Sequence, residues 1–174
     1  VLAAMQSPLK ADEHIDRGFA LTPPDVVVDQ HFLKRGRIGR LLPLMLQQGL
    51  PVIPFGIGVE EDSAVIVRGH AVEALGARGV LVVDLREAAS DAALGAFNLR
   101  GARLTYLVHG DGYDLKTRVL RPSAAKQKGS RIDPNAPGHK GYFGGTMFYP
   151  DMLGDFTIVN AMTRLVDSPQ REAF

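Results

Sequence analysis

Three polar side chains follow directly after a run of three valines near the start of the chain. The run, residues 26–28, comes after two prolines, and consecutive β-branched residues are typical of a short buried strand. The side chains that follow are an acid, an amide and an imidazole: Asp29, Gln30 and His31. In open α/β sheets, ligands bind outside the carboxyl ends of the strands. We therefore expect a binding or catalytic site where this strand ends.

Arginines come next in the sequence, at positions 35, 37 and 40. Cations are unfavourable at the start of a helix because the positive end of the helix dipole lies there. A bound anion would remove that penalty, and a planar guanidinium binds a carboxylate through two parallel hydrogen bonds. A structural histidine and a solvated arginine face are the plainer alternatives. The combination with Asp29, Gln30 and His31 favours a site for a substrate carboxylate.

A second apolar strand, residues 52–59, ends in a Gly-x-Gly sequence and leads to Glu60 and Glu61, about thirty residues after His31. If the two strands are neighbours, a carboxylate and the imidazole meet at one edge of the sheet. A carboxylate in that place orients a general base and stabilises its imidazolium form. Acidic pairs in loops are usually solvated, and the pattern alone leaves open which glutamate would act.

The remaining pattern predicts an α/β chain. The helix after His31 should run from about residue 36 to 48, end at Gly49 and be kinked or restarted at Pro43. Further expected elements are strands at 64–69, 70–75, 79–84 and 103–108, a short alanine-rich helix within 85–97, a turn over 109–114, an irregular arm over 123–145 and a terminal helix over 158–166 capped by Asp155 or Thr157. Residues 10–20 are expected to form a loop or short helix.

Composition excludes several function classes. The net charge of the 174 residues is +1, which gives no general attraction to nucleic acid or to an anionic membrane. The chain has no cysteine, so disulfides, zinc–thiolate sites and cysteine catalysis within it are excluded. No cofactor and no metal are expected. His109, Asp111 and Asp114 form a conceivable ligand set, but a Gly-Asp-Gly sequence is far more often simply a turn.

Three blocks of the sequence resemble a known family. They are Asp29-Gln30-His31-Phe32 with residues 35–41, then residues 56–64, and finally residues 107–115. Together they are similar to cyanophycinases, which belong to the serine-peptidase family that also contains dipeptidase E. The resemblance covers about residues 1–118. Its specificity comes from the first two blocks, which are multi-residue motifs in the family's order and spacing.

The resemblance implies a class I glutamine amidotransferase-like, flavodoxin-related three-layer sandwich. It further implies hydrolysis of β-aspartyl-arginine isopeptide units by a Ser-His-Glu triad. His31 falls on the family's catalytic histidine and Glu61 on the acid that orients it, with Glu60 as the alternative. The substrate pocket falls on Asp29, Gln30, Arg37 and Arg40, where the arginines would hold substrate carboxylates.

The chain departs from the family pattern in two ways. Residues 119–174 form an irregular extension beyond the 1–118 portion, and no serine lies in the small-residue strand-to-helix turn that carries the nucleophile. The opening, Val1-Leu2-Ala3-Ala4-Met5, resembles the helix that follows that turn. We therefore expect the chain to be the C-terminal part of a processed, heterodimeric enzyme, with an N-terminal chain as its partner, and we expect the assembly to be an oligomer. The alternative is a non-catalytic module that binds peptides with free carboxylates.

Overall fold

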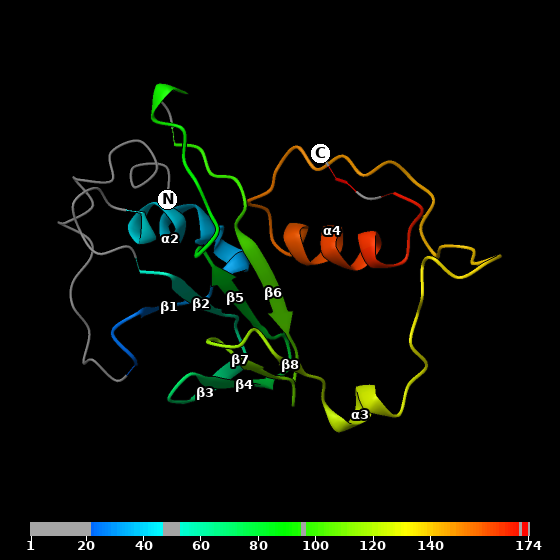
Figure 1. Ribbon diagram of the computed structural model, residues 1–174, viewed down its shortest axis with the longest axis horizontal. Helices are drawn as coiled ribbons and strands as arrows, with labels where there is room; N and C mark the ends of the chain where they lie inside the picture. Colours follow the sequence, from blue (N-terminus) through cyan, green and yellow to red (C-terminus); the bar gives the residue numbers. More distant parts are fainter. Residues whose placement is uncertain (1–21, 47–52, 95–96, 171, 174) are drawn as a thin grey trace.

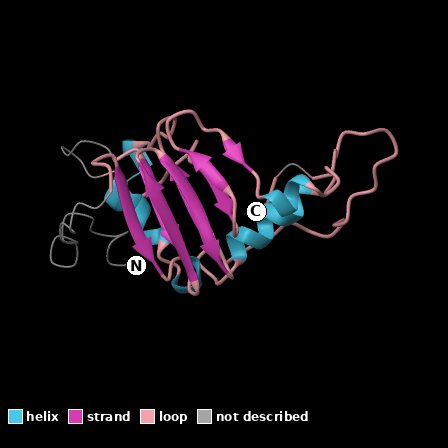
Figure 2. Ribbon diagram, turned by 90° about the horizontal axis from the view of Figure 1, so that it is seen from below, coloured by secondary structure: helices cyan, strands magenta, loops and turns pink. Residues whose placement is uncertain are grey.

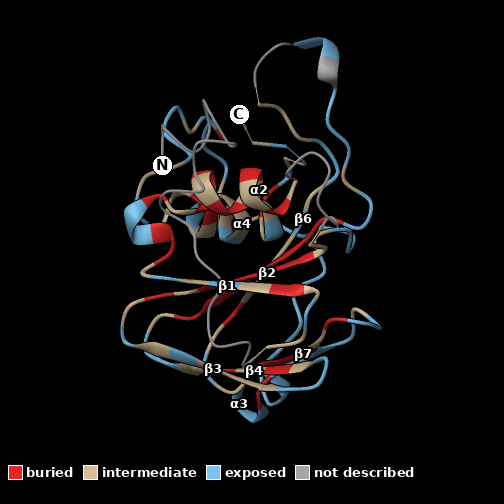
Figure 3. Cartoon of the chain, turned by 90° about the vertical axis from the view of Figure 1, so that its left-hand side faces the viewer, coloured by how far each residue is buried: buried red, intermediate tan, exposed pale blue. Residues whose placement is uncertain are grey.

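The computed structural model describes residues 22–46, 53–94, 97–170 and 172–173. The predicted loop over 10–20, the helical opening and the helix end at Gly49 lie outside these residues. Within them the chain forms three layers (Figures 1 and 3): helices α2 (Ile38–Met45) and α4 (Thr157–Val166) lie on one face of a four-stranded sheet, and a second four-stranded sheet lies on its other face. The α/β class is confirmed.

The first sheet has the order β1-β2-β5-β6. Strands β1 (Val26–Gln30) and β2 (Phe55–Val59) pair in parallel, with Gln30 opposite Val59, so they end together as predicted. Strands β5 (Val80–Asp84) and β6 (Arg103–Leu107) follow, each antiparallel to its neighbour (Figure 2). The strand predictions are confirmed, but the sheet is mixed and has a single parallel pair.

The second sheet is entirely antiparallel and has the order β3-β4-β7-β8. Strands β3 (Ser63–Arg68) and β4 (Ala71–Gly76) form the predicted hairpin, in which Gly69 has a φ of 59°. Strands β7 (Gly112–Asp114) and β8 (Leu120–Arg121) complete the sheet. The prediction of a turn over 109–114 was therefore wrong at its end, because residues 112–114 pair with β4.

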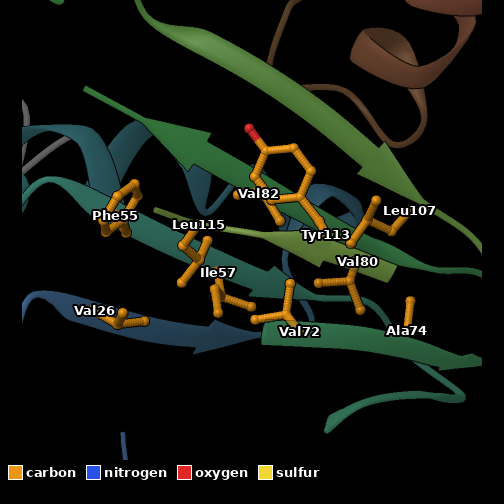
Figure 4. Packing of buried hydrophobic residues seen from close by; sticks show 10 residues of the cluster. All are labelled: Val26, Phe55, Ile57, Val72, Ala74, Val80, Val82, Leu107, Tyr113 and Leu115. Carbon is orange, nitrogen blue, oxygen red and sulfur yellow. The ribbon is translucent and has the colours of Figure 1, made fainter. Parts of the chain in front are cut away.

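Two hydrophobic cores lie on the two faces of the first sheet. Alternate residues of a strand point to opposite faces, and in β5 the side chains of Val80 and Val82 pack between the two sheets (Figure 4) while Leu81 and Val83 pack against the helices. The central sheet is thus buried on both sides. This explains why β2 and β5 are almost continuously apolar in sequence.

The helices differ in detail from the sequence prediction. Helix α2 continues through Pro43 without a restart, and a 3₁₀ turn, η2 (Leu33–Arg35), precedes it. Among its described residues, the alanine-rich segment forms the 3₁₀ turn η3 (Ala92–Leu94), and the irregular arm contains a short helix, α3 (Ala124–Gln127). The predicted cap of the terminal helix was wrong: Phe156 occupies the N-cap, and no side chain caps that end.

The C-terminal residues are attached to both layers of the fold. Strand β8 extends the second sheet, and the helix α4 packs into the core formed by α2 and the first sheet. The division into 1–118 and 119–174 remains a prediction. None of the helices in the described ranges has the length and apolar character needed to cross a membrane.

Candidate functional site

The adjacent ends of β1 and β2 bring an imidazole and a carboxylate together. His31 follows β1 and Glu61 follows β2, and the Nδ1 atom of His31 lies 3.4 Å from Oε1 of Glu61. Nδ1 is buried, whereas 41% of the His31 side chain is exposed, so the accessible part of the ring faces away from Glu61. The imidazole therefore has one buried nitrogen beside a carboxylate and an exposed part that solvent reaches.

Glu61 is held as an anion by two further cations. The ammonium of Lys34 donates a hydrogen bond to Oε2 at 2.5 Å, and the guanidinium of Arg35 lies 3.9 Å from Oε1. The hydrogen bond from Lys34 is the main cause that lowers the pKa of Glu61. An acid that stays ionised beside His31 is suited to stabilising an imidazolium. Sequence analysis did not assign Lys34 to the site.

Glu60 has the opposite environment, although it is the neighbouring residue. Its side chain turns inward and is only 4% exposed, and Oε1 accepts a hydrogen bond from the backbone N–H of Leu33 at 2.7 Å. Burial raises the pKa of Glu60 above its ordinary value. Among the described residues, no ion pair or hydrogen bond joins Glu60 to His31. Of the two candidate acids, the geometry favours Glu61.

The loop that carries Glu61 is fixed by a serine hydroxyl. The Oγ atom of Ser63 accepts hydrogen bonds from the backbone N–H groups of Arg78 at 3.1 Å and Gly79 at 2.9 Å. The same hydroxyl donates to the backbone oxygen of Glu61 at 3.3 Å. Ser63 is thus fully engaged in joining two loops. Its role in the described structure is to position the acid.

The four predicted pocket residues lie together but bind one another. Nε of Arg40 donates to Oδ2 of Asp29 at 2.7 Å, and its Nη2 donates to Oδ1. Nη1 of Arg37 donates to the backbone oxygen of Gln30 at 2.7 Å and lies 3.5 Å from Asp29. The hydrogen bond with Asp29 is the main cause that raises the pKa of Arg40. The structure thus brings both arginines beside the strand end, with Asp29 as their shared anion.

The glycines of β2 allow the site to form. An added Cβ atom on Gly58 would lie 2.0 Å from the ring of Phe32, which is fully buried next to His31. Gly56 stands under Met45 and Leu41 of α2 in the same way. The Gly-x-Gly sequence therefore provides space on the sheet for the turn and helix that carry the site. The spacing in the sequence indicated the strand end but not this packing role.

A segment distant in sequence borders the site. Arg78 donates to both carboxylate oxygens of Asp155, at 3.2 and 3.4 Å, and its guanidinium lies 4.3 Å from the centre of the Phe156 ring. Leu153 packs against Gly36, whose φ is 59°. The buried hydroxyl of Tyr106 has no partner in the described structure, and burial, followed by the charge of Glu60, raises its pKa to about 12. No sequence motif indicated these contacts.

The conceivable metal ligands do not converge. Nδ1 of His109 accepts a hydrogen bond from Gly76, Asp111 is buried and binds Lys126, and Asp114 binds Thr117. The described residues contain no group of three or more side chains able to hold a metal ion. His109 and Asp111 join their turn to other segments of the chain, and Asp114 stabilises its own turn.

The imidazole of His31 beside the carboxylate of Glu61 has a geometry suited to a general base and an orienting acid. A His–Glu pair with a free ring face can accept a proton from a hydroxyl nucleophile or from water. No serine among the described residues is hydrogen-bonded to His31. Ser123 caps α3 and Ser168 is buried, so neither is presented to the base. Within the described residues, His31 and Glu61 therefore lie together without a serine partner.

Comparison with known proteins finds that the chain is similar to several cyanophycinases. The chain is 34% identical over 121 residues to the cyanophycinase of Geminocystis herdmanii, and the matched region covers 64% of this chain and 42% of that protein. It is 34% identical over 106 residues to the cyanophycinase of Trichormus variabilis and 32% identical over 107 residues to that of Synechococcus elongatus, with 58% and 56% of this chain covered. No family model matches the chain.

These similarities support the cyanophycinase-like family relationship that the motifs predict. The matches cover 42%, 35% and 31% of the three relatives, so the chain spans less than half of their length.

Proposed function

We propose that this chain forms the base-and-acid half of a serine-type isopeptidase that hydrolyses β-aspartyl-arginine or related amide bonds. The observation that carries the proposal is the pairing of His31 with Glu61 at the joined ends of β1 and β2. The relatives named as cyanophycinases support the substrate class. In this mechanism His31 takes the proton of the attacking serine, and Glu61 orients and stabilises the imidazolium.

The nucleophilic serine comes from a polypeptide segment outside the described residues. Support comes from the open face of His31, from the absence of any bond between His31 and a described serine, and from the length of the relatives beyond the matched part. A class I glutamine amidotransferase-like sandwich would place such a segment on the free side of β1, which pairs only with β2 in the described sheet. A separate N-terminal chain and a continuous longer chain would both supply it.

The pocket beside the base is proposed to bind a substrate carboxylate. Arg37 and Arg40 lie within one helical turn of each other, and Asp29 holds them in place. A substrate carboxylate would bind these arginines beside Asp29 or in its place. A guanidinium group of the substrate could also bind Asp29 directly, because the carboxylate already binds guanidinium groups there.

The second candidate is a binding module that keeps the pocket but performs no chemistry. The observation that favours it is the mutual pairing of Asp29 with both arginines, which is stable without a reaction. In that case His31 and Glu61 would form a surface ion pair of little energetic value.

A replacement of the base distinguishes the two. In the full-length protein that carries this sequence, His31→Ala should lower kcat for β-aspartyl-arginine by about 10²–10⁴-fold. His70→Ala is the matched control, since His70 lies in the β3–β4 hairpin and is similarly exposed at 44%. Labelling by a serine-directed phosphonate should fall in parallel with activity. Hydrolysis at the native rate by His31→Ala would exclude the isopeptidase mechanism, and binding of the dipeptide without hydrolysis by the native protein would favour the module.

A further inference from the structure

Glu60 takes no part in the proposed proton transfer, yet it is held against the backbone of the turn that presents His31. Its Oε1 atom accepts the buried N–H of Leu33 at 2.7 Å. The bond connects the end of β2 to the residue two positions after the base. The carboxyl group of Glu60 therefore contacts the turn from the protein interior.

The turn requires such support. His31 has a φ of 48°, in the left-handed region that residues other than glycine adopt at an energetic cost, when the surroundings impose it. The next two residues are buried, Phe32 fully and Leu33 with 3% exposed, and Leu33 begins η2. The Phe32 ring on Gly58 anchors one side of the turn. The Leu33 N–H has Glu60 as its acceptor on the other side.

We propose that Glu60 is a positioning residue: by accepting the N–H of Leu33 it fixes the turn that directs Nδ1 of His31 toward Glu61. The catalytic consequence rests on the proposed function, but the positioning itself does not. The property required of Glu60 is an acceptor atom of the right reach. A negative charge is not required, because a buried neutral carboxyl or amide oxygen accepts the same hydrogen bond.

The direct test measures the turn and the ring without any reaction. Glu60→Gln keeps an acceptor oxygen, whereas Glu60→Met keeps the side-chain volume and removes the acceptor. Glu73→Gln on β4, where the side chain is 45% exposed, is the control. The ¹⁵N shifts of the His31 ring report the proton on Nδ1, and deuterium exchange reports the Leu33 amide. We expect the native protein, Glu60→Gln and Glu73→Gln to agree. Glu60→Met should show a loss of the Nδ1–H tautomer and at least tenfold faster exchange at Leu33.

The second measurement concerns activity in the full-length protein. Glu60→Gln should retain kcat within a few-fold, and Glu60→Met should lose about tenfold to a hundredfold in kcat with little change in KM, because small displacements of a reacting group have effects of about that size. If His31→Ala leaves hydrolysis unchanged, the proposed function fails while the spectroscopic result on Glu60 still stands or falls by itself.

Three outcomes would overturn the proposal. They are a Glu60→Gln variant as impaired as Glu60→Met, a Glu60→Met variant with native ring shifts and native protection of Leu33, and rapid exchange of the Leu33 amide in the native protein. The last measurement needs no folded variant. It therefore keeps the proposal testable if Glu60→Met fails to fold.

Discussion

Two adjacent glutamates in this chain have different properties because their surroundings differ. Glu61 lies among cations, which lower its pKa, and Glu60 lies beneath a turn, where burial raises its pKa. A pair of titratable groups whose environments move their pKa values apart often divides two roles between them. Here one carboxylate faces the base, and the other supports the backbone that carries it.

The arginines beside His31 carry a prediction at the same scale. Arg40 binds Asp29 through two nitrogens, a geometry that lysine cannot reproduce. Lysine at position 37 or 40 should therefore raise KM for β-aspartyl-arginine by about tenfold to a hundredfold, the loss of a charged hydrogen bond. Steady-state kinetics of the full-length protein measures it, with Arg68→Lys on β3, 73% exposed, as the control. Unchanged KM and kcat in both variants would make these arginines a solvated face.

At the scale of elements, the Gly-x-Gly sequence of β2 is a packing device. Gly58→Ala would place a methyl group 2.0 Å from the Phe32 ring, so the ring and the turn behind His31 must move. We expect a loss of about 1–3 kcal/mol in the free energy of unfolding, typical of overpacking a core. Urea unfolding measures the loss, and kcat should fall as well.

Gly144→Ala provides the matched control for Gly58→Ala. A Cβ atom at position 144 meets nothing within 4 Å, and its backbone is not in the left-handed region. That variant should unfold as the native protein does. A Gly58→Ala protein with native stability and native kcat would show that Phe32 does not fix the turn.

The sequence predicted those elements that have strong local signals. The apolar runs at 55–59 and 80–83 are strands whose two faces are both buried in the central sheet, and the pairing of β1 with β2 brings His31 to Glu61. The antiparallel direction of β5 has no local signal. No local signal distinguishes Glu60 from Glu61 either, because the difference depends on which carboxyl group accepts the N–H of Leu33.

Contacts between residues far apart in sequence were also inaccessible to sequence reasoning. Asp155 was predicted to cap the terminal helix, because acidic residues before helices commonly do so. In the structure it binds Arg78, 77 residues earlier, and Phe156 takes the cap position with a φ of 60°. The cation at position 78 offers Asp155 a stronger partner than a backbone N–H group does.

At the scale of the whole molecule, charge is concentrated at both ends of the central sheet. The site lies where β1 and β2 end, and Asp84 lies at the opposite end, since it pairs in register with Phe55 at the start of β2. Its carboxylate is 1% exposed and accepts hydrogen bonds from Arg86 at 2.6 Å and Arg118 at 2.8 Å. This cluster joins the second sheet's loop, which carries Arg118, to the first sheet.

The Asp84 cluster predicts how stability depends on pH. Burial of Asp84 opposes its ionisation, but the hydrogen bonds from Arg86 and Arg118 outweigh burial and hold the pKa of its carboxyl well below the ordinary value. A carboxyl with a depressed pKa in the folded state stabilises the fold above its unfolded pKa, about 3.9, and this contribution is lost as pH falls toward the folded pKa. Asp84→Asn should therefore lower the free energy of unfolding at pH 7 by about 3 kcal/mol, the low end for breaking a buried pair, since both arginines reach solvent.

Urea unfolding at pH 7 and from pH 5 to 2 measures both the loss of stability in Asp84→Asn and its dependence on pH, with Glu73→Gln as control. The difference between the native protein and Asp84→Asn should shrink below about pH 4. A difference that stays constant down to pH 2 would mean that the Asn side chain is destabilising for reasons other than charge.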